Sequence, residues 1–131
     1  MKKIIATTLL LPLLTFATPG LAQVVIDLQF QPTSEQLLEV IESATKDKNY
    51  ATALRVANNA IKQFPGLAEA YYYRAIALSN LGNQEDARLD FGQAKKLYLS
   101  QLKNAKISAQ EKSEASAKLE RVEQNLLLLK S

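Results

Sequence analysis

The feature of this sequence that most constrains its fold is a self-similarity at a spacing of 34 residues. When the chain is shifted against itself by this spacing, the identical pairs include Glu35 with Glu69, Asn49 with Asn83, Ala53 with Ala87, and Ala60 with Ala94. A period of this length is typical of helix–turn–helix units that stack side by side. Each such unit buries its apolar face only against a neighbour, so we expect a short array of helical hairpins.

Apolar residues in the first unit recur at the three- and four-residue spacing of a helix. Thr33 and Gln36 form a capping-box signature, which predicts a first helix from about Ser34 to Lys46. A polar turn at 46–50 separates this helix from a second apolar stripe, which ends at the Phe-Pro-Gly sequence of residues 64–66. Two helices joined by so short a loop pack antiparallel.

The second unit begins like the first but ends differently. A helix is expected from Ala68, followed by a turn at Gly82 and a second helix from about Glu85. No proline closes this second helix, and its apolar stripe continues to Ala105. We therefore expect the helix to run to about Lys106.

The C-terminal segment, 107–131, has the pattern of a third long helical element. Ser108 and Glu111 form another capping box. An apolar stripe follows at alternating steps of four and three, through Ala115, Leu119, Val122, Leu126 and Leu129. This helix is expected to fold back as an antiparallel cap, because two repeats alone leave both ends of the array exposed. Leu126–Leu129 encircle the helix, so one packing face cannot cover all four side chains. The first hairpin, a second molecule or a membrane surface could cover the remaining leucines. The membrane is the least favoured of these, because no strong basic face lies beside the leucines.

Residues 1–22 have the pattern of a secretory signal peptide. Two lysines precede an apolar run, and Gly20 and Ala22 fit a small-residue cleavage site. An uncleaved anchor is the weaker alternative, because the run is shorter than the roughly 20 residues that a membrane span needs. We expect cleavage after Ala22 and a periplasmic, lumenal or secreted protein, in which an extended leader at 23–32 precedes the helices.

Composition argues against most recognisable enzyme mechanisms. The chain has no cysteine and no histidine, which removes thiolate and imidazole metal ligands and the usual nucleophile pairs. Without Lys2 and Lys3 the charge is 14 basic against 13 acidic residues, which gives little support to nucleic-acid binding. The acidic group of Glu35, Glu39 and Glu42 is interpreted as a solvated helix face. We expect no enzyme activity, no cofactor and no metal.

The second unit resembles a tetratricopeptide repeat. The matching residues are Tyr71, Ala75, Leu78, Gly82, Ala87, Phe91 and Ala94. The resemblance covers about 34–97, and it implies an all-α fold in which repeat-like hairpins at 33–66 and 67–106 form a short solenoid, capped by the long helix of 107–131.

The resemblance also implies a function in protein–protein interaction, since the first helices of such repeats line a concave groove that holds a peptide or a partner protein. Carried over by position, the groove residues are Glu35, Leu38, Glu42, Thr45 and Lys46 in the first unit, and Glu69, Tyr72, Ile76, Ser79 and Asn80 in the second. Acidic residues beside apolar ones predict a partner segment with an apolar anchor and a basic residue. Family members that grip the carboxylate tails of chaperones have polar or basic side chains where this chain has Leu38 and Glu42, so that activity is not expected.

Three adjacent tyrosines in the second unit are expected to face three different surfaces, because successive residues of a helix are turned by about 100°. Tyr71 is predicted to lie in the core and Tyr72 in the groove. Tyr73 is predicted to lie at the junction with a neighbouring helix or in solvent. The alternative function is a structural one, in which the C-terminal hairpin associates with a second copy through its leucines.

Overall fold

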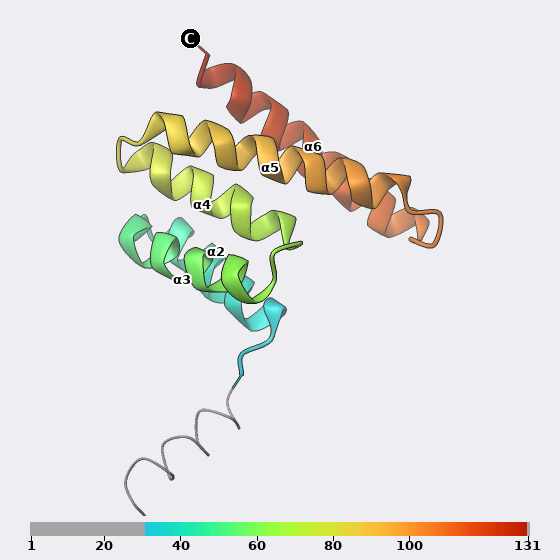
Figure 1. Ribbon diagram of the computed structural model, residues 1–131, viewed down its shortest axis with the longest axis horizontal. Helices are drawn as coiled ribbons and strands as arrows, with labels where there is room; N and C mark the ends of the chain where they lie inside the picture. The colour runs from blue at the N-terminus through green and yellow to red at the C-terminus, as the bar shows by residue number, and fades with distance from the viewer. Residues whose placement is uncertain (1–30, 131) are drawn as a thin grey trace, which may run out of the picture. The chain divides into compact units, whose positions relative to one another are not determined.

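The computed structural model describes residues 31–130, which fold into five α-helices (Figure 1). Their bounds are α2 Ser34–Lys46, α3 Tyr50–Gln63, α4 Ala68–Asn80, α5 Gln84–Lys103 and α6 Ala109–Leu128. No strand occurs in this part of the chain, and the expected all-α class is confirmed. The predicted signal peptide and nearly all of the leader lie outside the described residues.

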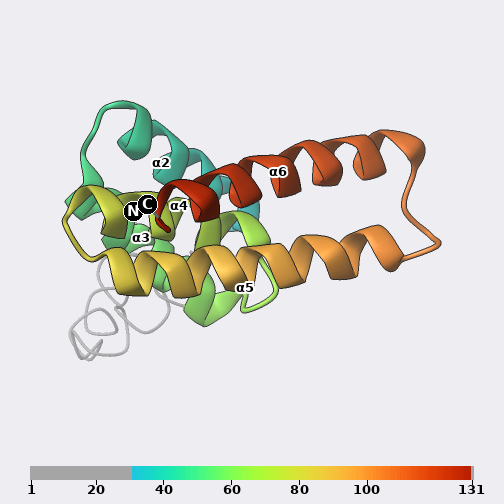
Figure 2. The same ribbon diagram turned by 90° about the horizontal axis from the view of Figure 1, so that it is seen from above.

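Each helix packs against the next one in the chain, and α2 also contacts α4. The helix α4 lies between the α2–α3 hairpin and the α5–α6 hairpin (Figures 1 and 2). The helices α5 and α6 are the longest, and they run side by side past the start of α4. This is the predicted arrangement of repeat-like hairpins followed by a capping helix.

The two turns within the repeat-like hairpins have the same structure. Lys48 and Gly82 have positive φ angles of 57° and 91° and directly precede Asn49 and Asn83. The Asn49 N–H donates to the Ala44 carbonyl at 2.8 Å, and the Asn83 N–H donates to the Leu78 carbonyl at 2.9 Å. These bonds close a Schellman motif. Each asparagine side chain also caps the helix that follows, so one short segment both ends a helix and starts the next.

The interior is divided into two apolar clusters. The first joins α2, α3 and α4 around Ile41, which is fully buried. The second joins α4, α5 and α6 around Phe91, Tyr98 and Val122. Alanines fill the contacts between helices in both clusters, which allows the helix backbones to approach closely. The cap therefore shares its core with the second hairpin.

The side chain of Arg74 in α4 links α4 to both α3 and α5. Arg74 of α4 donates two hydrogen bonds to Asp90 of α5, at 2.6 and 2.7 Å, and a third to Asn58 of α3 at 2.9 Å. Asp90 is 7% exposed, so the pair is sheltered from solvent. Buried carboxylates need such partners, and the bidentate geometry fixes α3, α4 and α5 relative to one another.

One expectation about the C-terminal half is wrong in detail. The helix α5 ends at Lys103 rather than near Lys106, because the Asn104 side chain accepts a hydrogen bond from the Lys106 N–H at 3.0 Å and turns the chain. Ala105 is consequently exposed.

The C-terminal leucines do not pack on the first hairpin. Leu126 and Leu129 pack against the second cluster instead, and no residue of α6 belongs to the first cluster within the described part of the chain. Leu127 and Leu128 are 65% and 72% exposed.

Candidate partner-binding groove

The predicted groove residues lie on α2 and α4, and a small pocket beside Tyr72 and Tyr73 is completed by residues of α5 and α6. In Figure 2, α2 and α6 lie toward one side of the molecule, whereas α3 and α5 lie toward the other. Tyr73 of α4 packs against the first cluster and contacts Tyr72. Burial raises the pKa of Tyr73, the charge of Glu42 in α2 raises it further, and the charge of Arg121 in α6 lowers it. Charged residues of both α2 and α6 therefore lie close enough to Tyr73 of α4 to change its pKa.

Of the predicted groove residues of α2, Glu35 and Lys46 are exposed, and Leu38, Glu42 and Thr45 are half-buried. Backbone hydrogen bonding and the Ser34 hydroxyl, which donates to the carboxylate at 2.9 Å, lower the pKa of Glu35. Leu38 is half-buried against the first cluster. Glu42 and Lys46 form an ion pair at 3.0 Å, but both side chains are largely in solvent, so the pair is weak. The Thr45 hydroxyl donates to a backbone carbonyl of its own helix.

The predicted groove residues of α4 are more buried than those of α2. Tyr72 and Ile76 pack against the second cluster, and the Tyr72 ring meets the edges of Tyr73 and Phe91 at centroid distances of 5.3 and 5.8 Å. Asn80 is exposed and donates to the Ile76 carbonyl at 2.8 Å, while Ser79 donates to Gln84. The apolar part of the predicted groove is thus partly used by the core.

Glu69 has a partner that the sequence did not predict. Lys118 of α6 donates to its carboxylate at 2.6 Å, and the Glu69 side chain is only 19% exposed. The acidic edge that we expected on both repeats is therefore neutralised on α4. Among the predicted groove residues, the only acidic ones without a partner on another helix are those of α2.

The three adjacent tyrosines do not lie on three separate surfaces, because Tyr71 and Tyr72 both pack against the second cluster, and Tyr72 and Tyr73 line the same pocket. Tyr71 is half-buried rather than a full core residue, since its hydroxyl reaches out to donate to the Pro65 carbonyl at 3.1 Å. The Arg74 guanidinium lies over its ring at 5.6 Å. Tyr73 lies at the junction with the first hairpin and also lines the groove.

A small pocket of about 40 Å³ opens in the groove where α4, α5 and α6 meet. It is lined by Glu69, Tyr72, Tyr73, Tyr98, Lys118 and Arg121. Four of these residues, Tyr73, Tyr98, Lys118 and Arg121, were not among the predicted site residues. Tyr98 was visible in the sequence only as one member of a core stripe, and the two cations lie beside the seam of α6.

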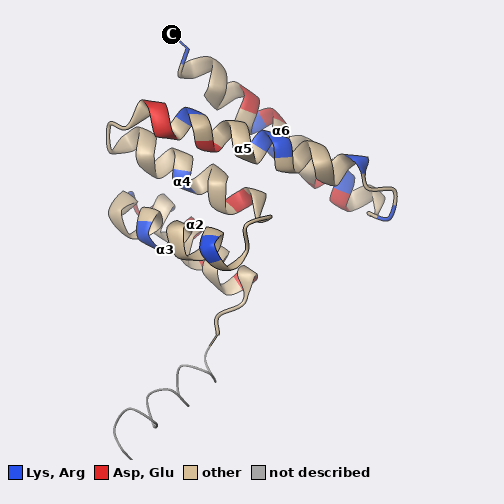
Figure 3. Cartoon of the chain, viewed as in Figure 1, with Lys and Arg blue, Asp and Glu red and all other residues tan. Residues whose placement is uncertain are grey.

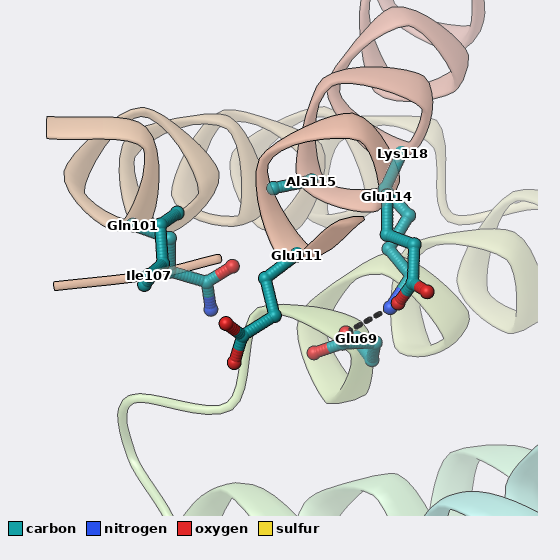
Figure 4. Close-up of a pocket in the computed structure, with 7 residues that line it drawn as sticks. All are labelled: Glu69, Gln101, Ile107, Glu111, Glu114, Ala115 and Lys118. Atoms are coloured by element: carbon teal, nitrogen blue, oxygen red, sulfur yellow. Dashed lines mark hydrogen bonds and ion pairs between the residues drawn. The ribbon is translucent and has the colours of Figure 1, made fainter. Parts of the chain in front are cut away.

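A larger pocket of about 330 Å³ lies where the α5–α6 hairpin extends past the start of α4. Gln101, Glu111 and Glu69 point toward the same space, and the Glu69–Lys118 ion pair borders it (Figure 4). Because that ion pair also lines the smaller pocket, it forms a shared wall between the two. Glu111 is engaged in the cap of α6, since it accepts from the Ser108 N–H at 2.6 Å.

Residues 56–89 match a family model described as tetratricopeptide repeat. The match begins within α3, spans all of α4 and ends within α5, so it contains the centre of the groove. This chain contains a tetratricopeptide repeat. Comparisons with curated proteins and with solved structures found no match.

Charge is unevenly distributed around the tetratricopeptide repeat. Its central helix α4 carries only Glu69 and Arg74, whereas charges of both signs occur along α5 and α6 (Figure 3). No group of acidic, cysteine or histidine side chains within residues 31–130 could hold a metal ion. Over the same residues, no helix combines the length and the apolar character that crossing a membrane requires.

Proposed function

We propose that this chain is an adaptor that binds a peptide or a partner protein in the groove formed by α2, α4 and α6. The observation that supports it best is the Tyr72–Tyr73 pair on the tetratricopeptide repeat, because both rings are only half-buried in the middle of the groove. Aromatic side chains at the centre of a concave surface are the usual anchors of protein–protein contacts. The repeat family is generally a non-catalytic interaction module, which is why we assign no enzyme activity.

Charge defines the expected chemistry of the partner near α2. Glu35 and Glu42 lie on that side of the groove, and the ion pair between Glu42 and Lys46 is open to solvent. A basic side chain of the partner could therefore bind there, while an apolar side chain contacts the tyrosines. We assign the basic residue to the α2 side because Glu69 on α4 is already paired with Lys118.

The binding experiment compares capture of proteins from the native compartment by three forms of the mature protein. The groove variant is Glu35→Lys with Glu42→Lys. The control is Glu85→Lys with Glu120→Lys, which makes the same change in net charge at exposed positions of α5 and α6 that are not among the predicted groove residues. We expect the groove variant to lose a protein that both the wild type and the control retain. Equal yields from all three forms would show that the groove assignment is wrong.

Export is part of the proposal. The signal pattern of residues 1–22 supports it, and the compartment would be the periplasm, an organelle lumen or the exterior. Intact-mass measurement of the protein purified from its native source tests it. A mature chain that begins at Gln23 is expected, and a chain that retains its first residues would contradict cleavage.

The alternative function is structural, through self-association of the α5–α6 hairpin. The exposure of Leu127 at the end of α6 favours it, since large apolar side chains this exposed often mark contact surfaces when they cluster. In that case the tetratricopeptide repeat serves to hold the hairpin.

A further inference from the structure

Tyr98 at the floor of the small groove pocket is a buried side chain whose hydroxyl group is not used by the fold. The residue is 1% exposed, and its ring is one of the largest fully buried side chains. Its hydroxyl forms no hydrogen bond with any residue of 31–130. Every fully buried side-chain oxygen in this part of the structure has a hydrogen-bond partner. Since the Tyr98 hydroxyl has none, its oxygen is not fully buried and keeps contact with solvent. The pocket that Tyr98 lines provides that contact.

This arrangement is unusual for a core aromatic residue. Buried tyrosine hydroxyls normally find a protein partner, and a phenylalanine would fill the same space without a polar group. Burial, assisted by the negative charge of Glu69, strongly raises the pKa of the Tyr98 hydroxyl. The group therefore stays protonated and can donate a hydrogen bond into the pocket.

The charges around the pocket favour a negatively charged ligand. Lys118 and Glu69 neutralise each other at 2.6 Å. Arg121 lines the same pocket and forms no ion pair within the described chain. Glu42, whose charge also acts on Tyr73, belongs to α2 and does not line the pocket. The Arg121 guanidinium, which has no ion-pair partner among the described residues, and the Tyr98 hydroxyl, which donates no hydrogen bond to them, thus line the same pocket.

The size of the pocket limits the ligand to a small group. Its volume of about 40 Å³ exceeds the roughly 10 to 15 Å³ that one water-sized group requires. A carboxylate, with two oxygen atoms, fits such a space, whereas an aromatic side chain does not. The pocket opens into the groove, so a chain lying along α4 could deliver the group.

We propose that this pocket binds one carboxylate group of the partner, which accepts a hydrogen bond from Tyr98 and forms an ion pair with Arg121. The assignment rests on the proposed function, because the partner that carries the carboxylate lies in the same groove. It adds a second polar anchor of opposite sign to the basic residue expected near α2. The partner segment then has an acidic group toward α6 and a basic group toward α2, which fixes its direction.

Two small probes of identical composition test the ligand chemistry. One is N-acetylglutamic acid α-amide, with its carboxylate on the side chain, and the other is N-acetylglutamine, with its carboxylate at the chain end. The neutral control is N-acetylglutamine amide. Titrations at constant ionic strength are followed through the NMR signals of the Arg121 side chain and the Tyr98 ring. We expect saturable shifts with at least one acid, and affinity at least about tenfold weaker for the neutral amide. The tighter acid identifies the source, and equal binding of all three compounds overturns the assignment.

The variant Tyr98→Phe removes the hydroxyl and keeps the ring in the core. We expect it to weaken binding of the preferred acid about tenfold, as for the loss of a hydrogen bond to a charged group. Its thermal midpoint should equal or exceed that of the wild type, because no intramolecular bond is lost. The matched control, Tyr71→Phe, removes a hydroxyl that bonds to Pro65 outside the pocket, and it should leave binding unchanged.

A Tyr98→Phe protein that binds the acid normally, or that melts at a clearly lower temperature than the wild type, would contradict this role for the hydroxyl. These measurements need no natural partner. If the partner-capture experiment fails while the acid binds, the proposed function is wrong and the pocket assignment stands. If the groove variant loses the captured partner while neither acid probe binds, only the pocket assignment is wrong.

Discussion

Lys48 and Gly82 show how one residue can distinguish two otherwise similar hairpins. Both occupy the left-handed position that ends the first helix of a hairpin, and they are one repeat length apart in the sequence. Glycine adopts this conformation without steric cost, whereas a residue with a Cβ atom pays roughly 1 to 2 kcal/mol. The turn geometry is preserved at Lys48 because the Schellman bonds around it are intact.

The substitution Lys48→Gly should therefore stabilise the fold. We expect a gain of about 0.5 to 1 kcal/mol in the free energy of unfolding, since the relief of strain is partly offset by the greater backbone entropy of glycine in the unfolded chain. The companion change Gly82→Ala should cost about 1 kcal/mol. An added Cβ at Gly82 would meet nothing within 4 Å, so that cost would be conformational rather than steric. Urea unfolding of both variants checks this, and a neutral or destabilising Lys48→Gly would refute it.

Single residues also show what the sequence could and could not predict about the site. The helical period correctly indicated that Tyr73 faces a different cluster from Tyr71, but not that Tyr72 and Tyr73 would line one pocket. It could not show that Tyr72 would meet Phe91, because that contact depends on how two helices pack. The choice of tyrosine rather than phenylalanine at position 98, within a core stripe, was the one available signal for the pocket.

Among the elements, helix starts were predictable and one helix end was not. The capping boxes at Thr33 and Ser108 begin α2 and α6 where expected, because the side-chain and backbone groups involved are three residues apart in sequence. The end of α5 was predicted too late, because an asparagine within a polar stretch gave a weaker signal than proline or glycine. Local hydrogen bonding decides both cases, and only the first has a strong sequence signature.

The two capping boxes differ in charge, and this predicts a difference in pH dependence. In α6 the Ser108 N–H donates to the Glu111 carboxylate, and hydrogen bonds from the Ser108 backbone and hydroxyl lower the pKa of Glu111. A carboxyl group whose pKa is lowered by folding stabilises the folded state above its unfolded pKa. That contribution is lost as the pH falls through the folded pKa. In α2 the equivalent acceptor is the neutral amide of Gln36.

The first turn of α6 should therefore loosen as the pH falls below the ordinary glutamate value. In the first turn of α2 the acceptor of the capping box is neutral, and the group that titrates there is Glu35, whose pKa is also lowered by hydrogen bonds with the backbone, Ser34 and Thr33. Backbone NMR shifts of Ser108 and Thr33 followed from pH 6 to pH 2.5 make the comparison. The Ser108 amide should titrate with a midpoint below 4.5, the ordinary pKa of the group. Glu111→Gln should abolish that titration. A midpoint at or above the ordinary value would show that the cap does not favour the carboxylate.

At the scale of the whole molecule, α6 both completes the core and lines the small pocket beside Tyr72 and Tyr73. A two-hairpin array lacks a neighbour for its last helix, and Val122 with its flanking leucines supplies one. The same packing brings Lys118 to Glu69 and Arg121 to the groove pocket. The sequence predicted the seam of α6 but not which flanking side chains would face α4. That depends on the rotation and register of two helices that are far apart in the chain.

The position of Leu127 leads to a test that separates the adaptor from the structural alternative. Leu127 is 65% exposed at the end of α6, and Leu89 is 64% exposed on α5. If the end of α6 is a contact surface between copies, Leu127→Ser should shift the mature protein from dimer to monomer in sedimentation equilibrium at micromolar concentration. Leu89→Ser should leave the distribution unchanged, because it removes a similarly exposed side chain elsewhere. If the wild type is already monomeric at that concentration, the structural alternative fails, and the groove along α4 remains the surface to which a partner must be assigned.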